Sequence, residues 1–316
     1  MKRILVTGGA GFIGSHLCEE LIARGFQVVA VDNLSLGRKE NVAHLPKRAF
    51  TLLVKDLVHS RQLAKTLAKL GPFDCVFHLA ANSDVARSSV NPDVDLERTF
   101  LTTFAVLRLM RQLAIKKIVF ASTPAIYGDM VGKIKETRGP LFPLSHYGAG
   151  KLASEAFIAS FVANYGLQAW IFRFPNVVGE RATHGILYDF MRKLEKNPNF
   201  LEVLGDGGQT KPYLYVRDLI DGILFAWQHS DDDLNYYHIG VESRTKVRDI
   251  VSMTLKALRI SPTISYTGGS QGWVGDQRQY AYDVSKLARL GWKSPRTSNQ
   301  AVKKALESML LEKKNA

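Results

Sequence analysis

The chain has 316 residues, enough for one large domain or two ordinary domains with a buried core. Hydrophobic residues make up 46% and charged residues 22%, as in soluble globular proteins, and no apolar run is long enough to span a membrane. Lys and Arg exceed Asp and Glu by 13. The basic residues are scattered over predicted helices without a basic arm, so we expect a solvated basic surface and no nucleic-acid partner.

The chain contains two cysteines, Cys18 and Cys75, and both lie in apolar segments. A disulfide framework is therefore not expected, and we predict a cytoplasmic protein. The N-terminal apolar stretch is soon interrupted by glycines and is too short for a signal peptide. We predict no metal site.

Short apolar runs alternate with helical patterns in the first half of the chain. The runs are rich in Val, Ile and Phe, as strands buried on both faces are, and occupy residues 3–7, 28–32, 51–54, 75–79, 117–121 and 169–174. Helical patterns occupy residues 12–24, 60–70, 92–113 and 143–165. This alternation predicts an α/β fold, a Rossmann-type doubly wound parallel sheet with right-handed crossovers.

The pattern becomes less regular after Asn176. Glycine-rich loops at residues 205–208 and 267–269 separate helical patterns at residues 217–228 and 246–258. We predict a nucleotide-binding domain over residues 1–175 and a smaller, mixed substrate-binding domain over residues 176–316. A segment near residues 217–245 is expected to return to the sheet of the first domain.

A glycine-rich loop, Thr7-Gly8-Gly9-Ala10-Gly11-Phe12-Ile13-Gly14, joins the first predicted strand to the first predicted helix. Gly8 and Gly11 would give a tight turn and let backbone N–H groups approach a pyrophosphate. Gly14 would allow close helix–strand packing. The strand before the loop and the helix after it make this pattern a prediction of a dinucleotide site.

The second predicted strand ends at Asp32, about 20 residues after the glycines. A carboxylate at this place hydrogen-bonds an adenosine ribose and repels a 2′-phosphate, so NAD is the predicted cofactor. Arg38 is close enough in the sequence to keep NADP as an alternative.

Tyr147 and Lys151 are four residues apart on a predicted helix and therefore share a face. A free phenol titrates near pH ~10, and a neighbouring cation lowers its pKa, so we expect Lys151 to make Tyr147 a usable general acid/base at neutral pH. The Ser122-Thr123 pair lies between this helix and the glycine loop in the sequence.

These motifs resemble the extended short-chain dehydrogenase/reductase family, especially its nucleotide-sugar epimerases of the UDP-glucose 4-epimerase type. The resemblance covers nearly the whole chain and is carried by Thr7–Gly14, Asp32-Asn33-Leu34-Ser35, Asp56-Leu57, His78-Leu79-Ala80-Ala81, Ser122-Thr123, Ile126-Tyr127-Gly128, Tyr147 with Lys151, Arg173-Phe174-Pro175-Asn176, residues 213–219, Gly275-Asp276 and Leu290-Gly291-Trp292.

The resemblance implies a site for each ligand. The implied NAD-binding residues are Gly8, Gly11, Phe12, Ile13, Gly14, Asp32, Asn33, Ser35, Asp56, Leu57, Leu79, Ala80, Ala81, Ser83, Thr99, Ser122, Tyr147, Lys151 and Phe174. The implied catalytic residues are Thr123, Tyr147 and Lys151, and Ser83, Thr123, Asn176, Lys211 and Asp276 are the implied substrate-binding residues. Structural alternatives stay open at three positions: His78 as a strand-end histidine, Asp56 as a helix cap and Asn176 as a turn residue.

The chain departs from the family pattern at several positions. Arg98-Thr99 replaces an asparagine pair that the family often has near the nicotinamide. Pro124-Ala125 follows the active-site Thr, where 4,6-dehydratases have Asp-Glu, so elimination is disfavoured. Decarboxylating relatives use a Glu near this point and this chain has none there, so decarboxylation is disfavoured as well. Lys211 and Trp273 occupy the positions of the two arginines that clamp a diphosphate, and Arg181, His184 or Arg278 would compensate.

The resemblance implies an NAD-dependent epimerase of a nucleotide sugar, acting at C4 through a transient keto sugar. The helices over residues 92–113 and 143–165 would form a homodimer interface, as is usual in the family. An NAD-dependent dehydrogenase or reductase with net redox is the alternative within the enzymes. A non-catalytic NAD- or RNA-binding regulator is the alternative outside them, and the charge of +13 favours it.

Overall fold

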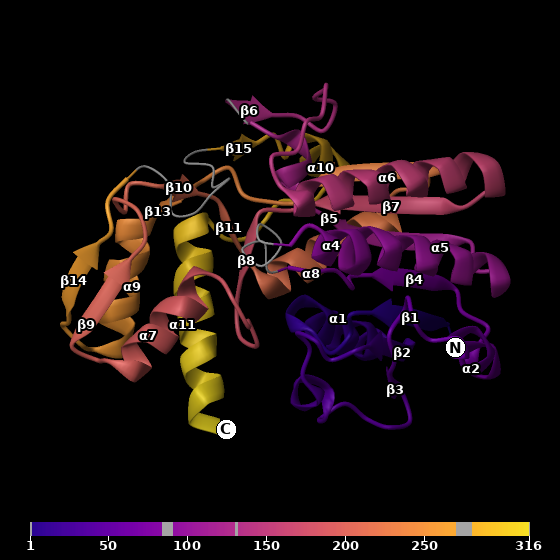
Figure 1. Cartoon of the computed structure of the whole chain (residues 1–316), viewed down its shortest axis with the longest axis horizontal. Helices are drawn as coiled ribbons and strands as arrows, with labels where there is room; N and C mark the ends of the chain where they lie inside the picture. The colour runs from indigo at the N-terminus through magenta and orange to yellow at the C-terminus, as the bar shows by residue number, and fades with distance from the viewer. Residues whose placement is uncertain (1, 84–90, 130–131, 270–279, 316) are drawn as a thin grey trace. The chain divides into compact units, whose positions relative to one another are not determined.

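The computed structural model describes residues 2–83, 91–129, 132–269 and 280–315. It divides into two compact units that are not continuous in the sequence. Unit 1 comprises Met1–Gly128, Phe142–Arg173 and Ile223–Tyr237, and unit 2 comprises Asp129–Leu141, Phe174–Gly222 and His238–Ala316 (Figure 1).

Unit 1 is built on a seven-stranded sheet with the strand order β12-β7-β5-β4-β1-β2-β3. The strands are β1 (Arg3–Thr7), β2 (Gln27–Asp32), β3 (Phe50–Val54), β4 (Cys75–His78), β5 (Lys117–Ser122), β7 (Gln168–Arg173) and β12 (Leu234–His238). The ladders that join β3, β2, β1, β4, β5 and β7 are all parallel. This order is that of a doubly wound dinucleotide-binding sheet and confirms the predicted fold class.

Helices cover both faces of this sheet. They are α1 (Phe12–Ala23), α2 (Leu63–Leu70), α4 (Asp93–Asp95), the π-helix η2 (Leu96–Leu101), α5 (Thr102–Gln112), α6 (His146–Tyr165) and part of α8 (Val216–His229), with the 3₁₀ turns η1 (Lys39–Val42) and η3 (Pro124–Tyr127). Leu5, Val76 and Phe120 pack in one cluster with residues of α2, α5 and α6. On the other face, Phe77 contacts Trp227 of α8, with ring centroids 5.1 Å apart.

The single helix predicted over residues 92–113 is wrong in detail, because the structure divides it into α4, η2 and α5. Threonine hydroxyls bond to carbonyls within this segment: Thr102 donates to Glu97 and Thr103 donates to Thr99. Side-chain bonds of this kind compete with the regular helix ladder and accompany π turns. The helix predicted from residue 143 begins instead at His146, because the Ser145 hydroxyl caps it by accepting from the Gly148 N–H.

The described part of unit 2 contains four two-stranded ladders. β8 (Asn176–Val178) pairs with β11 (Tyr213–Tyr215), β9 (Phe200–Val203) with β14 (Thr263–Tyr266), β6 (Lys133–Ile134) with β15 (Ala281–Tyr282), and β10 (Thr210–Lys211) with β13 (Thr245–Lys246). Its helices are α7 (Ile186–Lys196), α9 (Val247–Leu258), α10 (Ser285–Leu290) and α11 (Ser298–Asn315). The sequence did not predict α7, α10 or α11. Among the described residues, no helix has the length and apolarity needed to cross a membrane.

A buried ion pair joins α6 to the end of the sheet in unit 1. The Arg173 guanidinium donates to Glu155 at 2.6 and 3.0 Å and to the Tyr127 hydroxyl at 2.6 Å. The Ser122 hydroxyl also donates to Glu155. Both charged side chains are more than nine-tenths buried, so each relies on the other for compensation.

Arg173→Met is therefore expected to lower the free energy of unfolding by about 3–5 kcal/mol, because it leaves Glu155 buried and uncompensated. Lys133→Met is the matched control, since the Lys133–Glu242 pair is 51% and 67% exposed and should contribute about 0–1 kcal/mol. Urea denaturation of both variants measures the difference. Equal losses in the two variants would show that the buried pair has no special role.

Candidate active site

The glycine-rich loop lies at the carboxyl end of β1 and leads directly into α1. Gly8 has φ +73°, and a Cβ there would lie 2.8 Å from the Ala80 nitrogen. A Cβ at Gly14 would lie 2.0 Å from the Gly8 carbonyl oxygen, so neither position accepts a side chain. Gly11 caps α1 without a side-chain hydrogen bond, and the first turn of α1 carries no acidic residue. These residues fit an anionic pyrophosphate at the helix N-terminus.

Asp32 ends β2 beside this loop and is 8% exposed. Its carboxylate accepts from the Ala10 N–H at 3.0 Å and from the Leu34 N–H at 2.8 Å. Burial raises the pKa of Asp32, and these backbone hydrogen bonds oppose the rise. The carboxylate is thus fixed next to the glycine loop, where the sequence analysis expects an adenosine ribose.

Asp56 has all of its acceptor positions filled. One oxygen accepts from the Val58 and His59 N–H groups at 2.9 and 3.1 Å. The other accepts from Asn33 Nδ2 at 3.0 Å and Arg98 Nη1 at 2.6 Å. Burial opposes ionisation, but these four donors together lower the pKa of Asp56 to about 2. Asp56 is not the cap of α2, which begins at Leu63 after Gln62.

Arg98 and Thr99, although adjacent in the sequence, contact different carboxylates. Arg98 reaches Asp56, which the resemblance places beside the adenine rather than the nicotinamide. Thr99 is fully buried and its hydroxyl donates to Asp95 at 2.9 Å. The structure therefore leaves Thr99 no exposed surface for contact with a cofactor.

The segment after β4 lies against the glycine loop. The Leu79 N–H donates to the Thr7 carbonyl at 3.1 Å and the Ala80 N–H to the Thr7 hydroxyl at 3.4 Å. Leu79, Ala80, Ala81 and Ser83 are all partly exposed. His78 is fully buried between the Thr7 and Thr103 hydroxyls, at 2.6 and 3.0 Å. Burial, aided by Lys151, lowers its pKa to about 3, so His78 is neutral and supports the strand-end interpretation.

Thr123, Tyr147 and Lys151 are brought together where β5 ends and α6 begins. Thr123 forms a side-chain hydrogen bond with Tyr147 and also accepts from the Ala125 N–H at 3.2 Å. Lys151 Nζ lies 5.9 Å from the centroid of the Tyr147 ring. The same ammonium donates to the Ala121 carbonyl at 2.7 Å and lies 4.6 Å from the Phe120 ring centroid.

The charge state of this group differs from the prediction. Burial, aided by the charge of Asp95, raises the pKa of Tyr147, whereas the bond from Thr123 opposes the rise. Burial also lowers the pKa of Lys151 to about 7, against the attraction of Glu155 and Asp95. In the chain alone the Tyr147 pKa is therefore raised and not lowered as the helix spacing predicted, because desolvation of the phenolate is the largest effect.

Ser122 and Phe174, two further residues expected to bind the cofactor, belong to different units. Ser122 is 2% exposed and its hydroxyl is engaged by Glu155, so it does not face a ligand through its side chain. Phe174 is partly exposed and belongs to unit 2.

The expected substrate-binding residues of unit 2 are only partly described. Asn176 begins β8 rather than a turn, is exposed, and donates to the Tyr280 hydroxyl at 3.2 Å. In the ladder of β8 and β11, Asn176 is the partner of Tyr213, and Tyr213 follows the partly exposed Lys211 by two residues. Arg181 forms an ion pair with Glu312 at 3.7 Å. Gly275 and Asp276, together with Trp273 and Arg278, lie outside the described residues.

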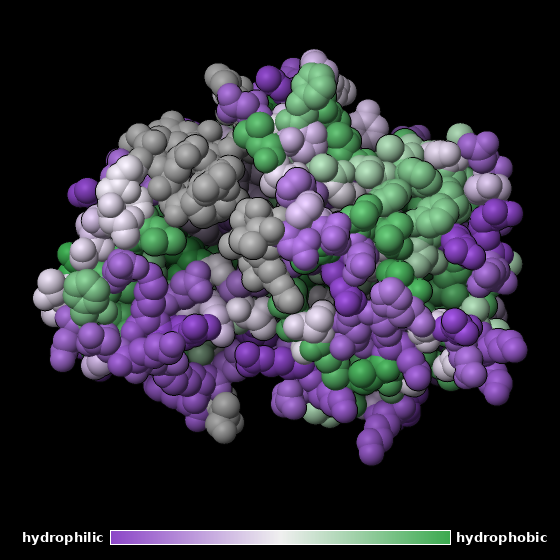
Figure 2. Space-filling model, in the orientation of Figure 1, coloured by the Kyte–Doolittle hydropathy of each residue, from purple (hydrophilic) through white to green (hydrophobic). Residues whose placement is uncertain are grey.

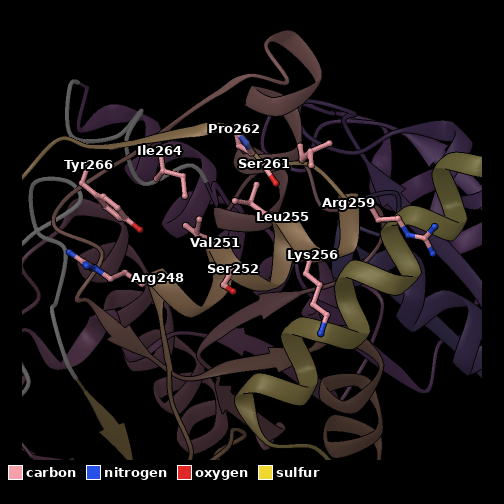
Figure 3. Close-up of a pocket in the computed structure, with 11 residues that line it drawn as sticks. Arg248, Val251, Ser252, Leu255, Lys256, Arg259, Ser261, Pro262, Ile264 and Tyr266 are labelled. Carbon is pink, nitrogen blue, oxygen red and sulfur yellow. The ribbon is translucent and has the colours of Figure 1, made fainter.

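Unit 2 also has an open groove between α9 and β14, with a volume of about 660 Å³. Figure 3 shows Arg248, Lys256, Tyr266 and their neighbours around it. No residue that the sequence analysis assigned to the cofactor or the substrate lines this groove.

Lys151 is expected to make stability depend on pH. The folded chain releases its proton near pH 7, whereas the unfolded chain holds it to about pH 10.4. Unfolding takes up a proton between these values, so the free energy of unfolding rises with pH across this window. Lys151→Met loses this contribution.

Urea denaturation of the NAD-free protein should therefore show wild type gaining stability over Lys151→Met as the pH rises from about 7 to about 10. The exposed Lys65→Met is the control and should follow wild type at each pH. A constant difference between wild type and Lys151→Met would contradict the assignment.

Known proteins resemble this chain in sequence and fold over nearly its whole length. Residues 4–240 match the NAD dependent epimerase/dehydratase family. A putative UDP-glucose 4-epimerase of Methanocaldococcus jannaschii is 33% identical over 311 residues, covering 97% of this chain and 98% of that protein. A crystal structure of a UDP-galactose 4-epimerase superposes with a TM-score of 0.86 at 38% identity, covering 98% of this chain and 99% of that one.

A Thermus thermophilus UDP-glucose 4-epimerase solved in complex with NAD has a TM-score of 0.83 at 30% identity, covering 98% of this chain and 99% of that one. These similarities extend over both units. The glycine loop, the acidic end of β2 and the Tyr147–Lys151 pair are consistent with them. The chain belongs to the NAD-dependent epimerase/dehydratase family.

Proposed function

We propose that this protein is an NAD-dependent epimerase of a nucleotide-activated sugar that acts at C4 through a transient 4-keto intermediate. The observation that carries the proposal is the group formed by Thr123, Tyr147 and Lys151 in the same unit as the glycine loop. UDP-glucose or UDP-galactose 4-epimerases are among the relatives and solved structures that resemble this chain.

Unit 1 would hold the dinucleotide. The glycine loop would bind the pyrophosphate, Asp32 the adenosine ribose, and Asp56 with Arg98 would border the adenine. Lys151 would also hold the nicotinamide ribose. Bound NAD would supply the reversible hydride transfer that oxidises and then reduces the sugar carbon.

Tyr147 would move the proton in this reaction. Thr123 is hydrogen-bonded to the phenol, so it can orient a sugar hydroxyl and pass its proton to Tyr147 Oη. Lys151, half-protonated near pH 7, would stabilise the phenolate. The neutral Pro124-Ala125 that follows Thr123 offers no acid or base for elimination. The keto sugar would then turn over in the site and receive the hydride back on its other face, which gives a carbinol with the opposite configuration.

Unit 2 would bind the nucleotide sugar through Asn176 and Lys211, with Asp276 and Ser83 as further expected contacts. Lys211 would neutralise diphosphate charge as a point cation rather than through a bidentate arginine. Both cysteines are buried and free, which supports a reducing, cytoplasmic location.

Conversion of UDP-, GDP-, CDP- and dTDP-hexoses by purified protein tests this proposal. An epimerase should purify with bound NAD and produce the C4 epimer of one hexose without net NADH. Stoichiometric NADH together with an accumulating oxidised sugar would instead indicate a dehydrogenase.

Tyr147→Phe should retain NAD and lose activity by about 10²–10⁴-fold, because only the proton-transfer group is removed. Tyr165→Phe, five turns further along α6 and 40% exposed, is the control and should keep its activity.

We also propose that two copies of the chain associate through α5, η2 and α6. Figure 2 shows hydrophobic residues gathered over this part of unit 1. Leu96 is 51% exposed, and Phe157 and Tyr165 are each 40% exposed. Phe157 contacts Phe100 and Phe104, with ring centroids 5.1 and 5.5 Å apart. An aromatic face of this kind favours burial against a matching face.

Phe157→Glu should convert the dimer to a monomer, because it would place charges at the centre of the apolar face. Analytical ultracentrifugation measures the outcome. Leu311→Glu, at a site on α11 that is 60% exposed, is the control and should remain dimeric. A monomeric wild type, or an unchanged Phe157→Glu, would contradict the proposed interface.

A further inference from the structure

Asp95 is a buried carboxylate to which the sequence analysis assigned no role. It ends α4 and is 1% exposed. Its Oδ1 accepts from Asn82 Nδ2 at 3.1 Å and from the Thr99 hydroxyl at 2.9 Å. Its Oδ2 is buried and has no hydrogen-bond partner in the described part of the chain. A carboxylate held this way costs several kcal/mol unless a nearby positive charge compensates it.

The backbone of α4 approaches α6 closely at Asp95. A Cβ on Gly150 would lie 3.2 Å from the Asp95 carbonyl oxygen and 3.2 Å from the Thr99 methyl carbon. Glycine at this position lets the two segments pack with little space between them. Thr99, whose hydroxyl donates to the Asp95 carboxylate, packs against Gly150, and Gly150 directly precedes Lys151 in α6.

The charge of Asp95 acts on both titrating residues of that face. It raises the pKa of Tyr147 and opposes the effect of burial on the pKa of Lys151. Glu155 also attracts Lys151, but it already forms an ion pair with Arg173. His78, from β4, is neutral at physiological pH. Among the described residues Asp95 forms no ion pair within 4.0 Å, and after Glu155 it is the second negative charge that acts on Lys151.

We propose that Asp95 is a positioning residue for proton transfer, with its buried carboxylate acting as the counter-ion of Lys151. The hydrogen bond from Asn82 gives this carboxylate a second role. Asn82 belongs to the segment after β4 that contacts the glycine loop, so Asp95 ties that segment to α6. The inference rests on the proposed function in so far as Lys151 and Tyr147 serve an epimerase.

Removal of the negative charge of Asp95 is expected to shift the pKa values of Lys151 and Tyr147 in the same direction. A negative charge favours the protonated forms of an amine and of a phenol, so its loss lowers both pKa values. A purely structural residue would alter stability or rate without moving the two titrations together. This difference makes the role testable.

The first experiment follows the Lys151 side-chain amine of the NAD-free protein by ¹⁵N-edited NMR, with the resonance assigned by its loss in Lys151→Met. The midpoint in wild type should lie at about pH 7. Asp95→Asn should shift it to lower pH by about one unit. Thr99→Val is the matched control, because it removes a hydrogen bond to Asp95 but keeps the charge, and its midpoint should stay with wild type.

The second experiment measures kcat against pH with the converted sugar nucleotide. Both limbs of the profile should move to lower pH in Asp95→Asn and stay in place in Thr99→Val. Asp95→Ser, smaller and equally neutral, is the second variant, and thermal melting confirms that each variant is folded. An unchanged Lys151 midpoint, or a shift of one limb alone, would overturn the proposal. A wild-type protein that converts none of the tested nucleotide hexoses would rule out the proposed function. The NMR titration would still decide the role of Asp95.

Discussion

The Lys151 ammonium is held out of water against the end of β5, and the candidate active site depends on this one placement. It is bonded to the Ala121 carbonyl, lies over the Phe120 ring and is only 3% exposed. Holding a cation there costs free energy, and the structure offsets this with the nearby charges of Glu155 and Asp95. The same placement fixes the rotation of α6 and so brings Tyr147 to Thr123.

Buried polar groups behind the site keep its parts in register. On one side, Ser122, Glu155 and Arg173 connect β5, α6 and β7. On the other, hydroxyls of Thr7, Thr103 and Ser154 form a chain through His78 that connects β1, β4, α5 and α6. Such satisfied networks rigidify a core because each member loses a partner if one element shifts. The catalytic face of α6 is therefore set by partners from five separate segments.

In the proposed function, unit 1 would recognise the dinucleotide and unit 2 the nucleotide sugar. Unit 1 carries the glycine loop, Asp32, Asp56 and the catalytic group, which are the features expected to hold a dinucleotide through turnover. Unit 2 carries Asn176 on β8 and Lys211 on β10, and Lys211 lies two residues before Tyr213, the partner of Asn176 on β11. A lysine in place of an arginine gives charge without fork geometry, so we expect diphosphate recognition in this protein to depend on several weaker contacts.

The sequence determined the order of strands and helices in unit 1, the glycine turn and the Tyr147–Lys151 pair, because these follow from local periodicity and fixed spacing. It led us to expect that a segment near residues 217–245 returns to this sheet, but it identified no strand there. The strand β12, Leu234-Asn235-Tyr236-Tyr237-His238, lies at the sheet edge and alternates instead of forming an apolar run. It also missed the division of the 92–113 helix, which depends on which carbonyls the threonine hydroxyls reach.

Only the tertiary structure decided the charge state of the site and the partners of its polar residues. Arg98 meets Asp56 across the carboxyl ends of β1 and β2, which separate β4 from β3 in the sheet. The Tyr147 pKa is raised rather than lowered because burial and Asp95 act through space from segments distant in the chain. Spacing along a helix places two side chains on one face, but desolvation and charge depend on everything that packs against that face.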